Sequence, residues 1–270
     1  MSERDGYQRG VPCWVDTWQP DLEAAVDFYT GLFGWDAEET SPPGAPRRHF
    51  MCTLRGRRVT GIGSPPPIPG HTPVWGTYVW VDDVEDAVAK AREAGGTVAL
   101  EPFDALDGGR LALLVDPAGG VIAVWQVGEN RGAQLVNEPG AWSMSVLHTS
   151  DLEAAKAFYS AVFGWSYETF GAGGGAMTLA LVPGYEGGEP EQPVSRETVA
   201  VMADMSGLPE EAPSHWGVDF WIADTDAAVA KATELGGKVV NPPTESPGFR
   251  SAVLADPQGA VFTISQLLVG

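Results

Sequence analysis

The sequence has few of the residues that mark disulfide-rich or metal-binding proteins. Its 270 residues include two cysteines, Cys13 and Cys52, too far apart to form a CxxC pair. Isolated cysteines in a chain of this length are typical of reduced core residues. The four histidines, at positions 49, 71, 148 and 215, have no i, i+4 or HxH spacing. A histidine metal site without such a motif therefore remains only a minor alternative.

Basic residues and long apolar segments are also scarce. Lys and Arg number 16 against 36 Asp and Glu, giving a formal net charge of -20. The electrostatic field of such a negative net charge repels phosphate backbones and anionic membranes and favours a cationic small ligand. No apolar run approaches the ~20 residues that cross a bilayer, and the polar start MSERDGYQRG lacks a signal-peptide core. We expect a soluble cytoplasmic protein with no nucleic-acid or membrane partner.

Nucleotide-binding motifs are missing as well. The glycine-rich residues 171–175 are followed by neither the Lys nor the Ser/Thr of a phosphate loop. The chain has no dinucleotide fingerprint and no nucleophile elbow. We therefore predict no cofactor.

What the chain does have is an internal repeat. Residues 21–35, DLEAAVDFYTGLFGW, return at 151–165 as DLEAAKAFYSAVFGW, with ten of fifteen positions identical at an offset of 130. The apolar residues follow the 3.6-residue period of a helix lying on a sheet. Asp21 and Asp151 are placed to cap the first turn, and Gly34 and Gly164 to end the helix in a left-handed conformation.

A second pattern also occurs twice. Strand-like residues 75–81 lead into a helix that begins after Asp83, and residues 215–222 lead into one that begins after Asp224. A turn beginning Asp-Pro precedes the last strand of each half, at Asp116 and Asp256. Four strand-helix-strands modules therefore pair into two domains, residues 8–128 and 142–270, with 129–141 as a linker. The long loop 183–193 has no counterpart in the first half and suits a lid or a solvated loop equally.

Taken together, these motifs resemble those of the vicinal oxygen chelate superfamily, the glyoxalase, bleomycin-resistance and extradiol-dioxygenase group. The resemblance rests on the DLE…FY…FGW helix, the Gly-Gly that ends the second helix, and the DPxG-like turn, each present twice from about residue 12 to 267. The tandem layout is similar to two-domain actinobacterial glyoxalase-like proteins. The resemblance implies an α+β fold of two tandem glyoxalase-like domains, each with two βαβββ modules whose curled mixed sheet surrounds a cleft.

The resemblance also implies where metal ligands would lie. In metal-dependent members they precede the Asp of each helix by seven residues or follow the Asp of the turn by seven. Those positions hold Trp14, Gly76 and Ala123 in the first domain and Met144, Gly217 and Thr263 in the second. None is the His, Glu or Gln that a divalent cation requires. We therefore predict no metal in either domain.

Side chains two apart along a strand share a face, so the cleft-facing residues can be counted from these positions. The first cleft is aromatic with one acid, and the second is more polar. The predicted ligand-binding residues are Trp14, Trp18, Tyr78, Trp80, Trp125 and Trp221, and the candidate acid/base residues are Asp16, His148 and Asp219. Core packing of the indoles and a hydrogen-bonded structural role for the polar groups are the alternatives.

Three functions remain open, and the sequence does not decide whether the chain is an enzyme. The first is metal-independent binding of an aromatic or cationic small molecule, in resistance or secondary metabolism. The second is an isomerase, cyclase, lyase or hydroxylase-like enzyme of natural-product or aldehyde metabolism, with Asp16 or the His148/Asp219 pair as acid and base. The third is that one domain only supports the other or forms a homodimer interface.

Overall fold

The computed structural model describes residues 2–65, 72–105, 108–171, 177–187, 194–205, 213–246 and 248–268, except for the side chain of Phe170. His71, most of the glycine-rich segment 171–175 and the second half of the loop 183–193 lie outside these ranges. Within them, no helix is long and apolar enough to cross a membrane.

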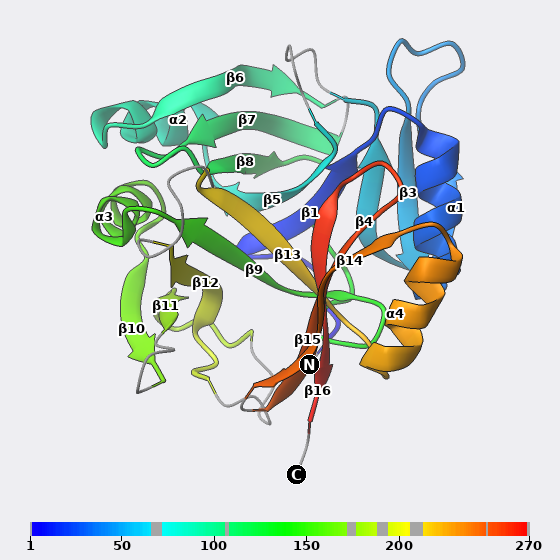
Figure 1. The fold of residues 1–270 in the computed structure, drawn as a ribbon. Helices are drawn as coiled ribbons and strands as arrows, with labels where there is room; N and C mark the ends of the chain where they lie inside the picture. Colours follow the sequence, from blue (N-terminus) through cyan, green and yellow to red (C-terminus); the bar gives the residue numbers. More distant parts are fainter. Residues whose placement is uncertain are drawn as a thin grey trace.

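The first half of the chain forms one mixed sheet of eight strands in the order β2-β3-β4-β1-β5-β8-β7-β6 (Figure 1). The strands are β1 (Pro12–Trp18), β2 (Asp36–Glu39), β3 (His49–Leu54), β4 (Arg57–Gly63), β5 (Val74–Val81), β6 (Thr97–Asp104), β7 (Gly109–Val115) and β8 (Val121–Val127). Helix α1 (Leu22–Phe33) follows β1, and α2 (Val84–Glu93) follows β5. Each βαβββ module therefore supplies four neighbouring strands.

The second half repeats this sheet in the order β10-β11-β12-β9-β13-β16-β15-β14. Its strands are β9 (Trp142–Thr149), β10 (Ser166–Phe170), β11 (Met177–Leu181), β12 (Thr198–Asp204), β13 (His215–Trp221), β14 (Lys238–Ser246), β15 (Phe249–Ala255) and β16 (Val261–Leu267). Its helices are α3 (Leu152–Phe163) and α4 (Thr225–Glu234). The predicted α+β fold of two tandem domains is confirmed.

The ends of the repeated helix have the predicted chemistry. Asp21 accepts a hydrogen bond from the backbone nitrogen of Ala24 at 3.0 Å, and Gly34 has a left-handed φ of 72°. Asp151 and Gly164 do the same at α3. A side chain at either glycine would strain the turn, since L residues disfavour that backbone region.

Each repeated helix is wedged between its own sheet and the sheet of the other domain. Phe33 of α1 packs on Phe220 of β13, with ring centroids 4.9 Å apart. Phe28 of α1 also reaches Gly237 behind α4, and its counterpart Phe158 of α3 reaches Gly96 behind α2 in the first domain. Helices α1 and α4 lie together on one side of the molecule and α2 and α3 on the other (Figure 1). The main cores therefore run between the domains.

Two buried polar chains cross the same interface. The Trp75 indole donates to the Tyr29 hydroxyl at 2.9 Å, and Tyr29 donates to Asp256 of the second domain at 2.9 Å. In the repeat, Trp216 donates to Tyr159, which donates to Asp116 of the first domain at 2.8 Å. The Asp of each Asp-Pro turn thus receives a tyrosine from the other domain, which explains why the Phe-Tyr pair recurs in both helices.

Candidate functional site

Asp16, in the middle of β1, is at the centre of the cleft predicted for the first domain. Its two strand neighbours present glycines, because Asp16 pairs with Gly61 of β4 and with Gly76 of β5. A Cβ on residue 76 would lie 3.4 Å from Asp16 Oδ1. Neither neighbour therefore places a side chain of its own against the carboxyl. We call this region, with the aromatic residues around it, the Asp16 cleft.

The carboxyl itself is buried and only partly satisfied. Asp16 is 6% exposed, and the Tyr78 hydroxyl donates to its Oδ2 at 2.8 Å. Oδ1 is buried and accepts no hydrogen bond of normal geometry from the described residues. Burial raises the pKa of Asp16 to about 7, against the opposing effect of the Tyr78 and Trp18 side chains. Burial and the Asp16 charge raise the pKa of Tyr78, so the phenol remains a donor.

His49 of β3 also lies beside Asp16, although its position in the sequence did not indicate this. A Cβ on residue 61 would clash with His49 Nε2 and lie 3.5 Å from the Asp16 Cβ, so the imidazole occupies the space above Gly61. His49 Nδ1 lies 3.1 Å from the Thr40 hydroxyl. Burial lowers the pKa of His49 to about 4, which makes it neutral at pH 7. His49 comes close to Asp16 because only β4 separates β3 from β1 in the sheet, and the sequence does not specify that strand order.

The predicted aromatic residues lie on one face, but they differ in exposure. Tyr78 pairs with Ala123 and Trp80 with Trp125 on β5 and β8. Trp14, Trp80 and Trp125 are buried, at 5%, 9% and 6% exposure. Trp125 donates to the Asn130 carbonyl, and Tyr7 packs near Trp80 with centroids 6.5 Å apart. These indoles are therefore enclosed, and of the predicted aromatic residues only Trp18 is partly exposed.

The residues at the metal-ligand positions do not fit a divalent cation. In the first domain these positions hold Trp14, Gly76 and Ala123, of which Gly76 pairs with Asp16, and none of the three side chains carries a metal-binding atom. The described residues contain no cluster of three or more His, Cys, Asp or Glu side chains that could hold a metal.

The second-domain cleft is more polar. Asp219 of β13 accepts a hydrogen bond from Ser265 at 2.7 Å, and Ser265 contacts Ser251 at 2.8 Å. Burial raises the pKa of Asp219 to about 7, although the residue is less enclosed than Asp16, and its Oδ1 has no partner among the described residues. Trp221 is buried at 7% exposure. This cleft offers a hydroxyl-lined carboxyl and no indole stack.

The register of β9 and β13 does not bring His148 and Asp219 together as an acid/base pair. Asp219 pairs with Met144, four residues before His148 on β9. At about 3.3 Å per residue, the two side chains lie roughly 13 Å apart along the strand. His148 instead pairs with His215 and stacks on it, with centroids 4.9 Å apart. Burial and His215 lower the pKa of His148. The two candidates are therefore separate groups.

Comparison with known proteins gives matches over both halves of the chain. Residues 14–124 match the Glyoxalase/Bleomycin resistance protein/Dioxygenase superfamily, and residues 144–265 match the Glyoxalase-like domain. CFP32 of Mycobacterium tuberculosis, named provisionally as a glyoxylase, is 38% identical, over 98% of this chain and 97% of its own length. The anthracycline biosynthesis protein DnrV of Streptomyces peucetius is 34% identical, over 98% of this chain and 96% of its own.

Solved structures share the fold at low identity. The Mn(II)-bound glyoxalase from Novosphingobium aromaticivorans has a TM-score of 0.61 at 15% identity, covering 98% of this chain and 83% of that one. The 2,3-dioxygenase LapB from Pseudomonas sp. KL28 has a TM-score of 0.62 at 16% identity, covering 97% and 92%. The chain therefore belongs to the glyoxalase, bleomycin resistance protein and dioxygenase superfamily, in which it forms two tandem glyoxalase-like domains.

Proposed function

We propose that this chain binds a planar aromatic small molecule in the Asp16 cleft without a divalent metal, in secondary metabolism or resistance. The observation that carries the proposal is the buried Asp16 carboxyl, which lies beside aromatic side chains and whose Oδ1 has no hydrogen-bond partner of normal geometry among the described residues. An unpaired buried acceptor costs free energy that a ligand donor recovers on binding. The ligand therefore carries a hydroxyl or ammonium group beside its ring system.

The geometry also suggests how such a ligand is oriented. Its donor group points at Asp16 between Gly61 and Gly76, while its ring stacks on the half-exposed indole of Trp18. Stacking of an aromatic ring on an indole contributes about 1 kcal/mol to binding in addition to the burial of apolar area. Relatives named for anthracycline biosynthesis make a polycyclic aromatic compound the natural first probe.

Tryptophan quenching provides a direct test of this placement. We expect an anthracycline to quench the protein's fluorescence saturably and Trp18→Ala to weaken its binding about tenfold, since stacking and burial are both lost. Trp221→Ala in the second domain is the matched control and should leave the affinity unchanged. Equal losses in both variants, or a loss confined to Trp221→Ala, would count against the first-domain site.

Metal independence has its own test. Because Trp14, Gly76 and Ala123 offer no ligand atoms, we expect the purified chain to bind the same probe equally well before and after dialysis against EDTA. Elemental analysis should find less than stoichiometric Mn, Fe, Ni or Zn. One equivalent of metal per chain, with affinity lost on chelation and restored by that metal, would refute this part of the proposal.

An acid/base enzyme of natural-product or aldehyde metabolism is the second candidate. The pKa of about 7 at Asp16, and likewise at Asp219, is the observation that favours it, because a carboxyl near neutral can both accept and donate a proton. In the first cleft, Tyr78 and neutral His49 would accompany Asp16; in the second, Asp219 or His148 would act singly. Binding differs from catalysis in that no product accumulates from a probe that saturates the cleft.

A further inference from the structure

The second sheet carries small polar side chains where the first sheet carries large apolar ones. In the first domain, Leu111 of β7 pairs with Trp125 of β8, and each is 6% exposed. Counted from the Asp-Pro turn, the same positions of the second domain hold Ser251 of β15 and Ser265 of β16, which also pair with each other. Two hydroxymethyl groups thus replace a leucine and an indole. Less side-chain volume therefore covers this face of the second sheet.

This face is in contact with solvent. Asp219, Thr263 and Ser251 are partly exposed on the neighbouring strands β13, β16 and β15. In the first domain, the counterparts of Asp219 and Thr263 are Tyr78 and Ala123, which are 3% and 2% exposed. Such alternation is typical of a sheet with one face in the core and one face accessible. The side chains that alternate with the exposed ones along β13 and β16 are at most 1% exposed: Val218, Phe220, Phe262 and Ile264.

The hydrogen bonds around Asp219 fix the direction of two hydroxyl groups. Ser265 donates to Asp219 Oδ2 at 2.7 Å, so its single hydrogen is used. Ser251 Oγ lies 2.8 Å from Ser265 Oγ and is therefore the donor in that contact. With both hydrogens used, Ser251 and Asp219 offer lone pairs. A ligand that contacts these two residues must supply the hydrogen-bond donors.

The charge of Asp219 defines the ligand further. The carboxyl has no cationic partner in the described part of the chain, and its strand neighbours Met144 and Thr263 are uncharged. A divalent metal prefers several carboxylate, imidazole or thiolate ligands, and no cluster of three occurs among the described residues. An organic ammonium group supplies one positive charge and up to three donors, which match a single carboxylate and a hydroxyl acceptor.

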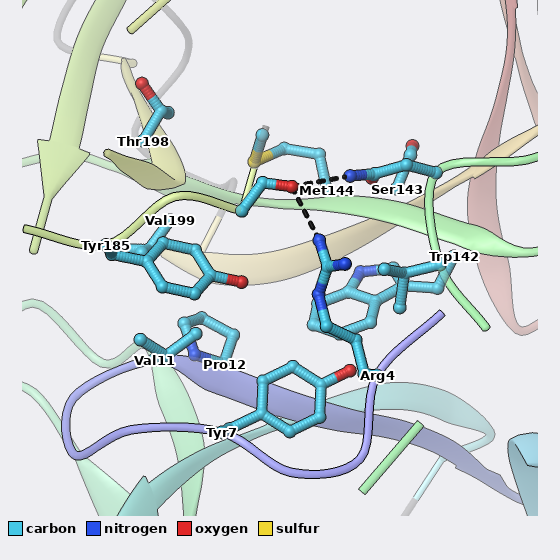
Figure 2. Close-up of a pocket in the computed structure, with 13 residues that line it drawn as sticks. Arg4, Tyr7, Val11, Pro12, Trp142, Ser143, Met144, Tyr185, Thr198 and Val199 are labelled. Atoms are coloured by element: carbon cyan, nitrogen blue, oxygen red, sulfur yellow. Dashed lines mark hydrogen bonds between the residues drawn. The ribbon is translucent and has the colours of Figure 1, made fainter. Parts of the chain in front are cut away.

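Apolar surface for the rest of such a ligand begins at Met144, which lies opposite Asp219 on β9. Figure 2 shows Met144 and Val199 at a hollow that encloses about 430 Å³, part of it open to solvent. Arg4 also lines this hollow and donates to the Gly187 carbonyl at 2.6 Å, so a second cation is disfavoured there. An amine therefore places its charge at Asp219 and its apolar part toward Met144.

We propose that the second-domain cleft binds a small primary amine with an apolar body, as its ammonium ion. The ammonium donates to Asp219 Oδ2 and to Ser251 Oγ, and the body packs toward Met144. Oδ2 accepts this bond beside the one from Ser265, whereas Oδ1 is buried and takes no part. This site is separate from the Asp16 cleft and does not depend on the function proposed there.

Cyclohexylamine, cyclohexanol and cyclohexanecarboxylate are the probes, because they share one ring and differ in charge. In calorimetric titration of the full chain at pH 8, we expect the amine to bind about tenfold more tightly than the other two, and more weakly as salt is raised. Asp219→Asn should weaken its binding about tenfold or more, and Ser251→Ala about fivefold. Glu168→Gln, at an exposed carboxyl of β10 outside the cleft, removes the same charge and should leave binding unchanged.

The pH dependence separates a ligand contact from a structural role. Burial raises the pKa of Asp219 to about 7, and a bound ammonium favours the ionised carboxyl. The affinity of the amine should therefore rise about tenfold from pH 6 to pH 8, and this rise should be absent in Asp219→Asn. The proposal is overturned if the three probes bind alike, or if Asp219→Asn and Glu168→Gln give the same affinity. It is also overturned if the pH profile persists in Asp219→Asn, or if Asp16→Asn removes the binding and Asp219→Asn does not.

Discussion

Asp256→Ala is expected to lower the free energy of unfolding by about 4 kcal/mol, the largest loss among the single substitutions considered. The carboxyl is 1% exposed and accepts four hydrogen bonds. Tyr29 and Gln19 donate from the other domain at 2.9 and 2.7 Å, and the backbone nitrogens of Gln258 and Ala260 donate from the turn at 2.9 Å each. Alanine removes one acceptor from each of these four donors; those of Tyr29, Gln19 and Ala260 are buried, and Gln19 keeps its bond to Thr17.

The repeat supplies matched comparisons for this prediction. Asp116→Ala removes the same carboxyl from the first domain but strands three donors, Tyr159 and two backbone nitrogens, so its cost should be somewhat smaller. Asp21→Ala removes an exposed helix cap and should cost about 1 kcal/mol. Urea unfolding followed by tryptophan fluorescence measures all three. A loss at Asp256 no larger than at Asp21 would contradict the interpretation.

The hydrogen bond between Tyr29 and Asp256 also predicts that the two domains unfold cooperatively. Tyr29 lies on α1 of the first domain, and Asp256 lies in the turn between β15 and β16 of the second. A substitution in either domain therefore weakens the packing of both, and we expect one unfolding transition rather than two. The DLE…FY…FGW repeat thus specifies the joint between the domains as much as either domain alone, since its Phe, Tyr and Trp side chains all enter the shared core.

Local signals in the sequence were enough for most of the scaffold. The capping residues and the 3.6-residue apolar period located α1 and α3, because these features depend on residues within one turn of each other. Strand β1 was also predicted at its observed bounds. The edge strands β2 and β14 were not predicted: their residues are almost all exposed, so no buried alternation marks them, and pairing with β3 and β15 defines them instead.

For the candidate sites, the sequence predicted which side chains of a single strand share a face, but not which strands lie next to each other. Counting by two placed Asp16 and Tyr78 on cleft-facing positions, and the register of β1 and β5 then brings them within hydrogen-bond distance. The same counting suggested a His148–Asp219 pair, but a four-residue offset in register separates them. His49 reaches the cleft through two strand pairings, β3 with β4 and β4 with β1, and no local pattern in the sequence encodes them.

Asp16→Asn is expected to stabilise the chain above pH 7 while removing ligand binding. Burial raises the pKa of this carboxyl to about 7 in the folded chain, whereas an unfolded aspartate titrates near 4. Between these values the folded state holds a proton that the unfolded state has lost. The contribution of Asp16 is therefore fully favourable below about pH 4, falls as the pH rises to about 7, and is flat above that.

Integrated over that interval, the ionisation of Asp16 costs roughly 4 kcal/mol, and asparagine, which does not titrate, avoids it. Urea unfolding of both proteins from pH 4 to 8 should thus give a stability difference that grows in favour of Asp16→Asn and levels off near pH 7. Asp27→Asn, at an exposed position on α1, corrects for the change in net charge. A difference independent of pH would contradict the raised pKa. A variant that is more stable at pH 8 yet no longer quenched by the aromatic probe would indicate that Asp16 is kept for its ligand, because packing alone would favour its replacement.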